Sequence, residues 1–289
     1  MAVEGRPRVS RYDGVVAQQI DFPATATALR RATQRVADLL GKVTRPEARA
    51  GRLDWTIAET AAHLVGSIDL WTGFVTGERD ANTYLRAARD ASTPGEVNAV
   101  GNAMVLDEFA ERDLSRLAPQ LVETVERFIV TANQTDRETR FMTDTGVAMT
   151  APLMAAALLG ELLVHGHDIA RGAHLPWPIP RAEALLVVAG VLALVPEYVN
   201  KQTTTGKHIS YELRFRGGPR YRIAIDDGTA DVGDPNGPVD CWISADPTAF
   251  LLVGYGRVGQ WSQALRGRLI SGGRKPWLGL KFADMLTSV

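Results

Sequence analysis

Residues 150–171 read TAPLMAAALLGELLVHGHDIAR, and this stretch decides the fold because it is a long helical pattern with very little polar surface. Thr150 suits the cap of such a helix and Pro152 suits its first turn, while Gly172 is placed to end it. A helix that is apolar on nearly all sides has to be covered by other elements. The stretch therefore predicts a helix buried inside a helical assembly.

Three further helical patterns precede this stretch. The second of them begins with a capping box, in which Thr56 is the cap and Glu59 stands three residues later. Residues 76–95 have no clear period, and residues 136–147 could form a small hairpin. Together with the buried helix, the three patterns predict a four-helix bundle. Their approximate limits are residues 23–43, 56–71 and 105–132, and the residues before about Ile20 are expected to be a flexible lead-in.

The hydropathy pattern changes near residue 205. A stiff, proline-rich linker over residues 176–180 leads into a fifth apolar helix over residues 181–200. Beyond it, runs of alternating hydropathy are separated by turn pairs such as Asn236-Gly237, which predicts short strands. The expected strands cover residues 208–215, 221–225, 230–233 and 239–245, and helix returns from residue 247 apart from a strand-like piece at 268–270.

The predicted fold class is therefore α+β. We expect a helical domain over residues 1–200, followed by a small α+β domain over residues 205–289. The length of 289 residues is consistent with two domains.

Composition excludes several classes of protein. The formal net charge is -1, whereas a general nucleic-acid binder normally shows a basic excess. Cys241 is the only cysteine, so neither an intrachain disulfide nor a cysteine-rich zinc site can form. The longest uncharged apolar run, residues 184–195, is shorter than the roughly 20 residues of a membrane span. Because residues 1–14 are polar and lack the apolar core of a signal peptide, we expect a cytoplasmic protein.

The buried helix carries its own polar group of residues. Glu161 and His165 stand four residues apart, so their side chains share one face of the helix about 6 Å apart. Asp168 follows three residues later on the same face, whereas His167 lies roughly 200° around the helix from His165. A carboxylate on an apolar helix is costly unless it is paired or binds a cation. The pair is either a simple hydrogen bond on an exposed stripe or part of a metal site.

A third candidate ligand comes from another helix. His63 lies on the second helical pattern, at the edge of its apolar stripe, where it could be an ordinary hydrogen-bonded histidine. Together with Glu161 and His165, it could instead complete a three-ligand metal site inside the bundle. Three protein ligands leave one position open, which is the arrangement of catalytic zinc sites.

Two segments resemble the signatures of a known family. Residues 53–64, LDWTIAETAAHL, resemble the second helix of the DinB-like metal-binding bundles. Residues 161–171, ELLVHGHDIAR, resemble the fourth helix of one branch of them, the mycothiol-dependent maleylpyruvate isomerase family of actinobacteria. The resemblance implies a DinB-like four-helix bundle followed by a small sterol-carrier-like α+β domain. The excess of arginine over lysine fits a high-GC actinobacterial source.

The resemblance also implies an activity. His63, Glu161 and His165 would hold a divalent metal, for which zinc is expected, and mycothiol would be the thiol cosubstrate. A cation held by two neutral imidazoles and one carboxylate keeps net positive charge, so it stabilises a thiolate and lowers the pKa of the thiol. The thiolate can add to an activated double bond and leave again, as in an isomerase, or stay attached, as in an S-transferase. Either enzyme would act on a small electrophile bound between the two domains.

Other residues complete the expected site. Asp168 is a candidate catalytic residue, which either supports the metal ligands or is a charge on the helix surface. The family also uses an arginine of its carboxy-terminal unit, for which Arg274 is preferred here over Arg268. Position 167 is often Trp in this branch and is His167 here. Cys241 lies in a strand pattern and is expected to pack in the core, so the nucleophilic thiol would come from the cosubstrate.

A different class of function stays open. The carboxy-terminal unit could bind an apolar ligand, which would make the protein a non-catalytic carrier or sensor with a structural metal in its bundle. Turnover of a thiol conjugate discriminates between the two hypotheses, because a carrier shows none.

The helical spacing makes a direct prediction about metal content. His165→Ala should abolish metal binding because it removes one of three ligands, whereas His167→Ala should leave metal content intact because its side chain points elsewhere. Elemental analysis of the two purified variants beside the wild type measures this. Equal loss of metal in both variants would refute the argument from the helical face.

Overall fold

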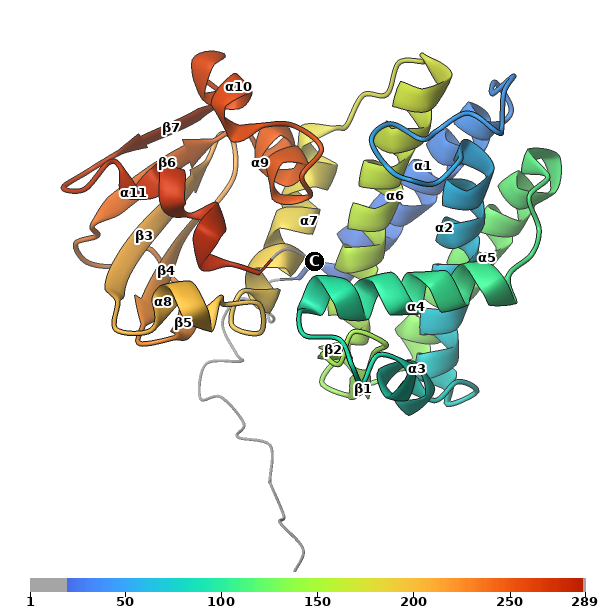
Figure 1. Ribbon diagram of the computed structural model, residues 1–289, viewed down its shortest axis with the longest axis horizontal. Coiled ribbons are helices and arrows are strands. Elements are labelled where there is room, and N and C mark those ends of the chain that lie inside the picture. The colour runs from blue at the N-terminus through green and yellow to red at the C-terminus, as the bar shows by residue number, and fades with distance from the viewer. Residues whose placement is uncertain (1–19, 288–289) are drawn as a thin grey trace, which may run out of the picture.

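The computed structural model describes residues 20–287, so the lead-in expected before Ile20 lies outside the described residues. Figure 1 shows two units side by side, a helical bundle and a sheet with short helices of its own. The predicted α+β fold class is confirmed.

Four helices form the bundle, and each packs against at least two of the others. The second begins with the predicted capping box: the Thr56 side chain accepts from the Glu59 backbone N–H, and the Glu59 carboxylate accepts from the Thr56 backbone N–H. Thr150 caps the fourth, as expected. These helices are α1 (Phe22–Leu40), α2 (Ile57–Thr76), α5 (Leu114–Gln134) and α6 (Ala151–Ala173).

The end of α6 differs from the prediction. Gly172 lies within the helix, and His174 takes the left-handed conformation after the last turn, with φ 55°. The glycine allows close packing instead, because a Cβ atom at this position would overlap the carbonyl oxygen of Arg49.

The helix expected over residues 105–132 is two helices. One is α4 (Pro94–Glu108), and after a short break Asp113 caps α5. The start of α4 is a capping box formed by Thr93 and Glu96. This local signal lies at the edge of the stretch for which the sequence showed no period, and it places the start of the helix earlier than the apolar spacing did.

Shorter elements surround the bundle. α3 (Ala81–Ala87) lies in the stretch without a clear period. The expected hairpin is present as β1 (Arg140–Met142) and β2 (Ala148–Thr150), which pair antiparallel. The proline-rich linker packs on the bundle, since Trp177 donates a hydrogen bond from its indole nitrogen to the carbonyl oxygen of Leu163.

The second unit is built on a five-stranded sheet with the order β5-β4-β3-β6-β7. Neighbouring strands are antiparallel except for β3 and β6, which are parallel. The strands are β3 (His208–Phe215), β4 (Arg220–Asp226), β5 (Thr229–Gly233), β6 (Cys241–Ala245) and β7 (Leu269–Gly272). The helices are α7 (Arg181–Leu194), α8 (Lys201–Thr204), α9 (Pro247–Gly254), α10 (Gln260–Leu265) and α11 (Leu278–Lys281), followed by a 3-10 turn at Ala283–Met285.

Helix α7 joins the two hydrophobic cores. Its Val187 is buried in the core of the bundle, and Val188 and Leu192 are buried in the core against the sheet. Close contact with α6 is possible because α7 has Gly190 opposite Ala156, where a Cβ atom would collide with the alanine methyl group. The helix therefore fixes the bundle and the sheet against each other.

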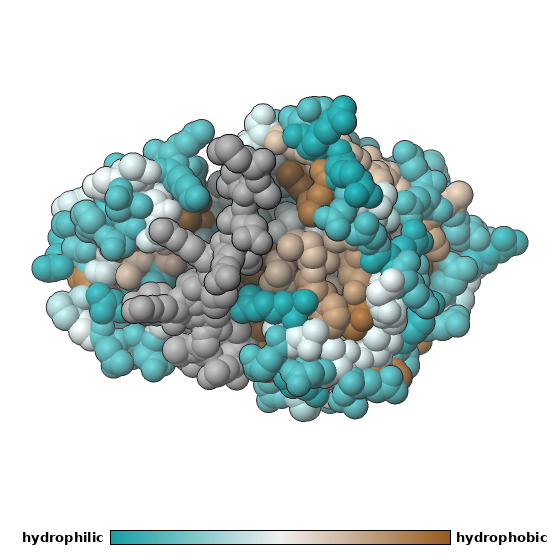
Figure 2. Space-filling view, turned by 90° about the horizontal axis from the view of Figure 1, so that it is seen from below, coloured by the Kyte–Doolittle hydropathy of each residue, from teal (hydrophilic) through white to brown (hydrophobic). Residues whose placement is uncertain are grey.

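Helix α6 is the central element of the bundle. Among the described residues, it is the one helix long and apolar enough to cross a membrane by length and composition, and 83% of its most apolar window is buried inside the protein. It therefore has the burial of a core helix. Figure 2 shows that apolar surface also gathers on the underside of the bundle, beside the second unit.

Candidate functional site

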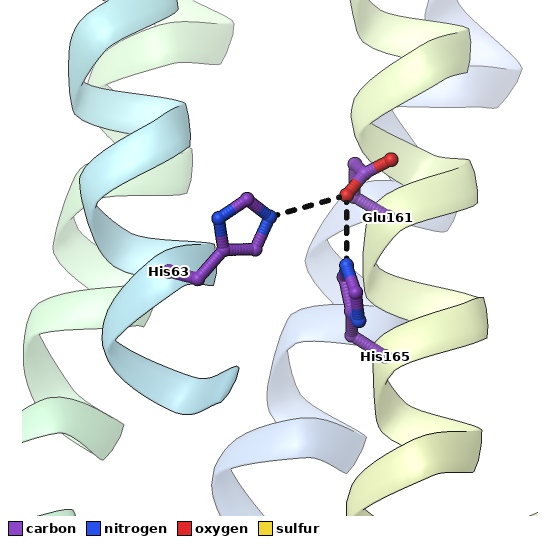
Figure 3. A group of neighbouring side chains, drawn as sticks. All are labelled: His63, Glu161 and His165. Carbon is purple, nitrogen blue, oxygen red and sulfur yellow. Dashed lines mark hydrogen bonds and ion pairs between the residues drawn. The ribbon is translucent and has the colours of Figure 1, made fainter. Parts of the chain in front are cut away.

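Three side chains from α2 and α6 converge inside the bundle (Figure 3). Glu161 Oε2 lies 3.5 Å from His63 Nε2 and 3.1 Å from His165 Nε2. The three candidate ligand atoms all lie within 4.8 Å of one another. Ligand atoms around a tetrahedral zinc ion at about 2.1 Å are about 3.4 Å apart, so this cluster is close in size to a zinc site.

Both imidazole rings are oriented by a partner on Nδ1. His63 Nδ1 lies 3.2 Å from Ser67 Oγ, one turn further along α2. His165 Nδ1–H donates to Asp168 Oδ2 at 3.2 Å. With Nδ1 engaged in each ring, Nε2 faces Glu161, which is how outer partners orient histidine ligands in metal sites.

Asp168 is buried beside the cluster and is not a charge on the helix surface. Its side chain is 2% exposed. In addition to the bond from His165, it accepts from Arg257 Nη2 at 2.8 Å, and Arg257 Nε lies 3.0 and 3.1 Å from its two oxygens. Arg257 belongs to the loop between α9 and α10. The second unit therefore contacts the bundle through this ion pair. The pair holds the carboxylate that binds His165 Nδ1.

Arg274, the preferred arginine of the second unit, pairs with a carboxylate of its own unit and not with a residue of the cluster. Arg274 Nη2 lies 3.1 Å from Asp240 Oδ1 beside the start of β6, and the Arg274 side chain is 68% exposed. Arg268, the other candidate, is also exposed. Arg257 reaches α6 instead. The signal that could have found it is a glycine-rich loop, residues 254–259, which carries one tyrosine and one arginine between two predicted helices.

Burial and pairing set opposite charges in the cluster. Burial lowers the pKa of His63. Burial also acts to lower the pKa of His165, but its hydrogen bonds with Asp168 and Glu161 outweigh this and raise the pKa to about 9. Burial acts to raise the pKa of Glu161, but hydrogen bonds from the two histidines hold it well below its usual range. The cluster without a metal therefore combines a carboxylate, an imidazolium and a neutral imidazole at neutral pH.

The cluster is accessible from the side of the glutamate. The Glu161 side chain is 29% exposed, whereas the side chains of His63 and His165 are 4% and 9% exposed. Trp55 lies over the histidines, with its ring centroid 4.8 Å from that of His63 and 6.2 Å from that of His165. A small molecule would therefore approach past Glu161, and the indole of Trp55 shields the rings elsewhere.

Two other residues from the sequence argument lie apart from this cluster. His167 is not part of the one group of potential metal ligands found among the described residues, and burial lowers its pKa. Cys241 is buried in the second unit, and burial raises the pKa of its thiol. A thiol of this kind is a poor nucleophile at neutral pH.

Comparison with known families identifies the family of the bundle. Residues 29–170 match the family model described as the mycothiol maleylpyruvate isomerase N-terminal domain. The bundle belongs to this family. The resemblance found in the two helical segments is thereby confirmed, and the matched range contains α2 and α6 with all three residues of the cluster.

Solved structures extend the likeness of the fold to both units. The crystal structures of the mycothiol-dependent maleylpyruvate isomerase and of a mutant of it are 15% and 16% identical to this chain, each with a TM-score of 0.52. Each of these two matches covers 89% of this chain and 95% of the isomerase chain. Sterol carrier protein 2 of Yarrowia lipolytica matches 29% of this chain at 17% sequence identity and a TM-score of only 0.24. No curated protein matches the sequence.

The buried ion pair predicts a difference between the two arginines. Arg257→Met should lower the free energy of unfolding by about 3 kcal/mol, because it leaves the buried carboxylate of Asp168 without its guanidinium. Arg274→Met should cost less than about 1 kcal/mol, because that pair is largely exposed. Urea denaturation of the metal-free proteins measures both.

A double variant shows where the cost arises. Adding Asp168→Asn to Arg257→Met should restore part of the lost stability, because the neutral amide needs no cation. Equal costs for the two single arginine variants would contradict the assignment.

Proposed function

We propose that this protein is a metal-dependent, mycothiol-using enzyme that acts on a small electrophile as a thiol-dependent isomerase or an S-transferase. The observation that carries the proposal is the convergence of two buried imidazoles and one partly exposed carboxylate inside a bundle of this family. His63, Glu161 and His165 would hold a divalent cation, with zinc as the expected ion. When bound, such a cation supplies a Lewis acid that stabilises a thiolate and lowers the pKa of the thiol.

The residues of the chain account for the rest of the chemistry. Asp168 and Ser67 hold the two imidazole rings so that Nε2 of each faces Glu161. Arg257 neutralises Asp168, which leaves Glu161 as the carboxylate that faces the ligand position. Trp55 limits access of water to the histidines. Since the only protein thiol is buried in the second unit, the nucleophilic sulfur has to be brought by a cosubstrate.

The electrophile would bind between the bundle and the second unit. The loop after α9 brings Tyr255 against α6, where a Cβ atom at Gly160 would lie 2.9 Å from the tyrosine oxygen. Gly160 precedes Glu161, so this loop borders the exposed side of the cluster. A substrate there would contact residues of both units. Whether the sulfur leaves again or stays attached depends on the electrophile, so the same site supports either reaction.

The alternative, a carrier or sensor of an apolar ligand, has less support. A cavity of about 190 Å³ lies between α1, α7 and β4. It is smaller than the roughly 300–1,000 Å³ of typical small-molecule sites. Its lining includes Leu185, Leu186, Ala189, Pro219 and Tyr221.

The raised pKa of His165 predicts that metal binding depends on pH. A metal takes only the neutral imidazole, so below about pH 9 one proton has to leave His165 when the cation binds. The apparent affinity for zinc should therefore rise about tenfold for each pH unit between pH 7 and 9 and then level off. Asp168→Asn should shift this rise to lower pH, because it removes a charge that favours the imidazolium.

Titration of the metal-free protein against a competing chelator measures this dependence. An affinity that does not change from pH 7 to 9 would show that His165 is neutral before the metal binds.

The function itself is tested by a thiol-dependent assay. Wild type, Cys241→Ser and His63→Ala are incubated with mycothiol and either maleylpyruvate or 1-chloro-2,4-dinitrobenzene, which report isomerisation and S-transfer. Cys241→Ser should keep its activity, because the sulfur comes from the cosubstrate. His63→Ala should lose both metal and activity.

His208→Ala is the matched control, since His208 lies on β3 with a side chain that is 72% exposed. It should behave as wild type. Loss of activity in a folded, metal-loaded Cys241→Ser protein would reject the external thiol. Absence of thiol turnover by the wild type on both electrophiles would favour the carrier.

A further inference from the structure

Exposed apolar side chains gather at one place on the second unit. Among residues 20–287, eight large hydrophobic side chains are exposed, and five of them lie between Trp261 and Leu280. Helix α10 carries Trp261 and Leu265, α11 carries Leu280 with Trp277 just before it, and Ile270 is on the edge strand β7. Single exposed apolar residues are ordinary on a protein surface, whereas two tryptophans and two leucines on neighbouring helices mark an interaction site.

Helix α10 has the reverse of the usual polarity. Gln263 is buried and points into the protein, whereas Leu265 is 89% exposed. Trp261 and Leu265 stand two residues on either side of Gln263, so helical spacing places both on the outer face, one turn apart. A surface helix normally buries its apolar residues and exposes its polar ones. The apolar face of α10 is therefore available to a binding partner.

Helix α11 presents its apolar residues beside those of α10. Its inner side faces the sheet, since a Cβ atom at Gly279 would overlap the side chain of Ser271 on β7. Trp277 and Leu280, three residues apart, are both exposed. Gln260 at the start of α10 donates from Nε2 to the carbonyl oxygen of Leu280 at 3.5 Å, and both helices contact β7 (Figure 1). The exposed residues of the two helices therefore belong to one region of the surface.

The segment around these helices is strongly basic. The whole chain has a net charge of -1, yet residues 247–287 contain six basic residues and one acidic residue, Asp284. An exposed cation follows each exposed leucine, Arg266 after Leu265 and Lys281 after Leu280. Such side chains keep their charged ends in water while their stems lie along apolar surface. The four apolar side chains and these two cations form what we call the α10–α11 surface, which comprises Trp261, Leu265, Arg266, Trp277, Leu280 and Lys281.

The combination of apolar and basic side chains favours a lipid surface over other occupants. Tryptophan suits the boundary between lipid headgroups and acyl chains, because its ring is largely apolar and its N–H is polar. Leucines add apolar area that the acyl chains cover, and cations attract anionic headgroups. A second copy of the chain would bring like charges face to face. A nucleic acid would stack on the tryptophans but would leave Leu265, the most exposed of the four, without a role.

We propose that the α10–α11 surface binds the headgroup region of a bilayer that contains anionic lipids. The four apolar side chains enter the boundary between headgroups and acyl chains, and the two cations meet the lipid phosphates. The protein is then a peripheral membrane protein that attaches through its second unit. Neither the three-residue cluster nor Arg257 is part of this surface, so the inference does not depend on the proposed function.

Co-sedimentation of the full chain with vesicles tests the proposal. The protein should bind vesicles of phosphatidylcholine and phosphatidylglycerol in equal parts, and it should bind vesicles of phosphatidylcholine alone about tenfold more weakly. Binding should weaken as salt is raised to about 0.5 M, because salt screens exposed charges. Leu265→Ser should lower the partition coefficient about tenfold, because it removes apolar area from the lipid contact. Lys281→Glu should lower it about fivefold or more, because it replaces an attraction by a repulsion.

Matched controls come from the bundle. Val130→Ser replaces an apolar side chain that is also exposed, on α5, and Lys42→Glu reverses an exposed cation after α1 with the same change in net charge as Lys281→Glu. Both controls should bind vesicles as wild type does. All four variants change exposed side chains, so urea denaturation should show stability close to that of wild type. Any thiol-dependent turnover of wild type should be unchanged in Leu265→Ser.

Several outcomes would overturn the lipid surface. No binding of the wild type to the anionic vesicles, wild-type binding by Leu265→Ser, or equal losses in Lys42→Glu and Lys281→Glu would each do so. Without vesicle binding, a dimer that Leu265→Ser dissociates in analytical ultracentrifugation would assign the surface to a second copy. Binding of a single-stranded oligonucleotide that Lys281→Glu weakens, again without vesicle binding, would assign it to nucleic acid.

Discussion

The placement of two carboxylates on an apolar helix, one partly exposed and one buried, is the constraint on which the site depends. Glu161 and Asp168 lie on α6, most of which is packed inside the bundle. A buried carboxylate is tolerated only with compensating partners. Glu161 takes its partners from α2 and α6, whereas Asp168 takes its partners from α6 and the second unit. These requirements bring three separate elements of the chain to one place.

The ion pair of Asp168 links the stability of the protein to its chemistry. Arg257 pairs with a carboxylate that binds His165 Nδ1, so the same contact that joins the two units also orients the imidazole with Nε2 toward Glu161. Helix α7 reinforces the arrangement because it contributes to both hydrophobic cores. The expected division at about residue 200 thus falls in a region where the two units share a helix and are not joined by a free linker.

The two sides of the cluster differ in a way that suits a two-substrate reaction. Trp55 covers the histidine side, whereas the glutamate side is partly exposed and borders the loop of the second unit. The proposed cosubstrate and electrophile therefore share a single approach. In the proposed enzyme, specificity would then lie in residues outside the three-residue cluster.

The sequence by itself determined the helices and the local relations within them. Helical spacing predicted that Glu161, His165 and Asp168 share a face and that His167 does not, because a helix repeats every 3.6 residues whatever surrounds it. The capping box at Thr56 and the turns of the sheet are local in the same sense. Only the tertiary structure decided that Arg257, and not Arg274, reaches α6. Arg257 is 89 residues from Asp168 in the chain. Partners at such a separation are selected by the packing of whole elements, and the period of one helix carries no information about which distant side chain will cover it.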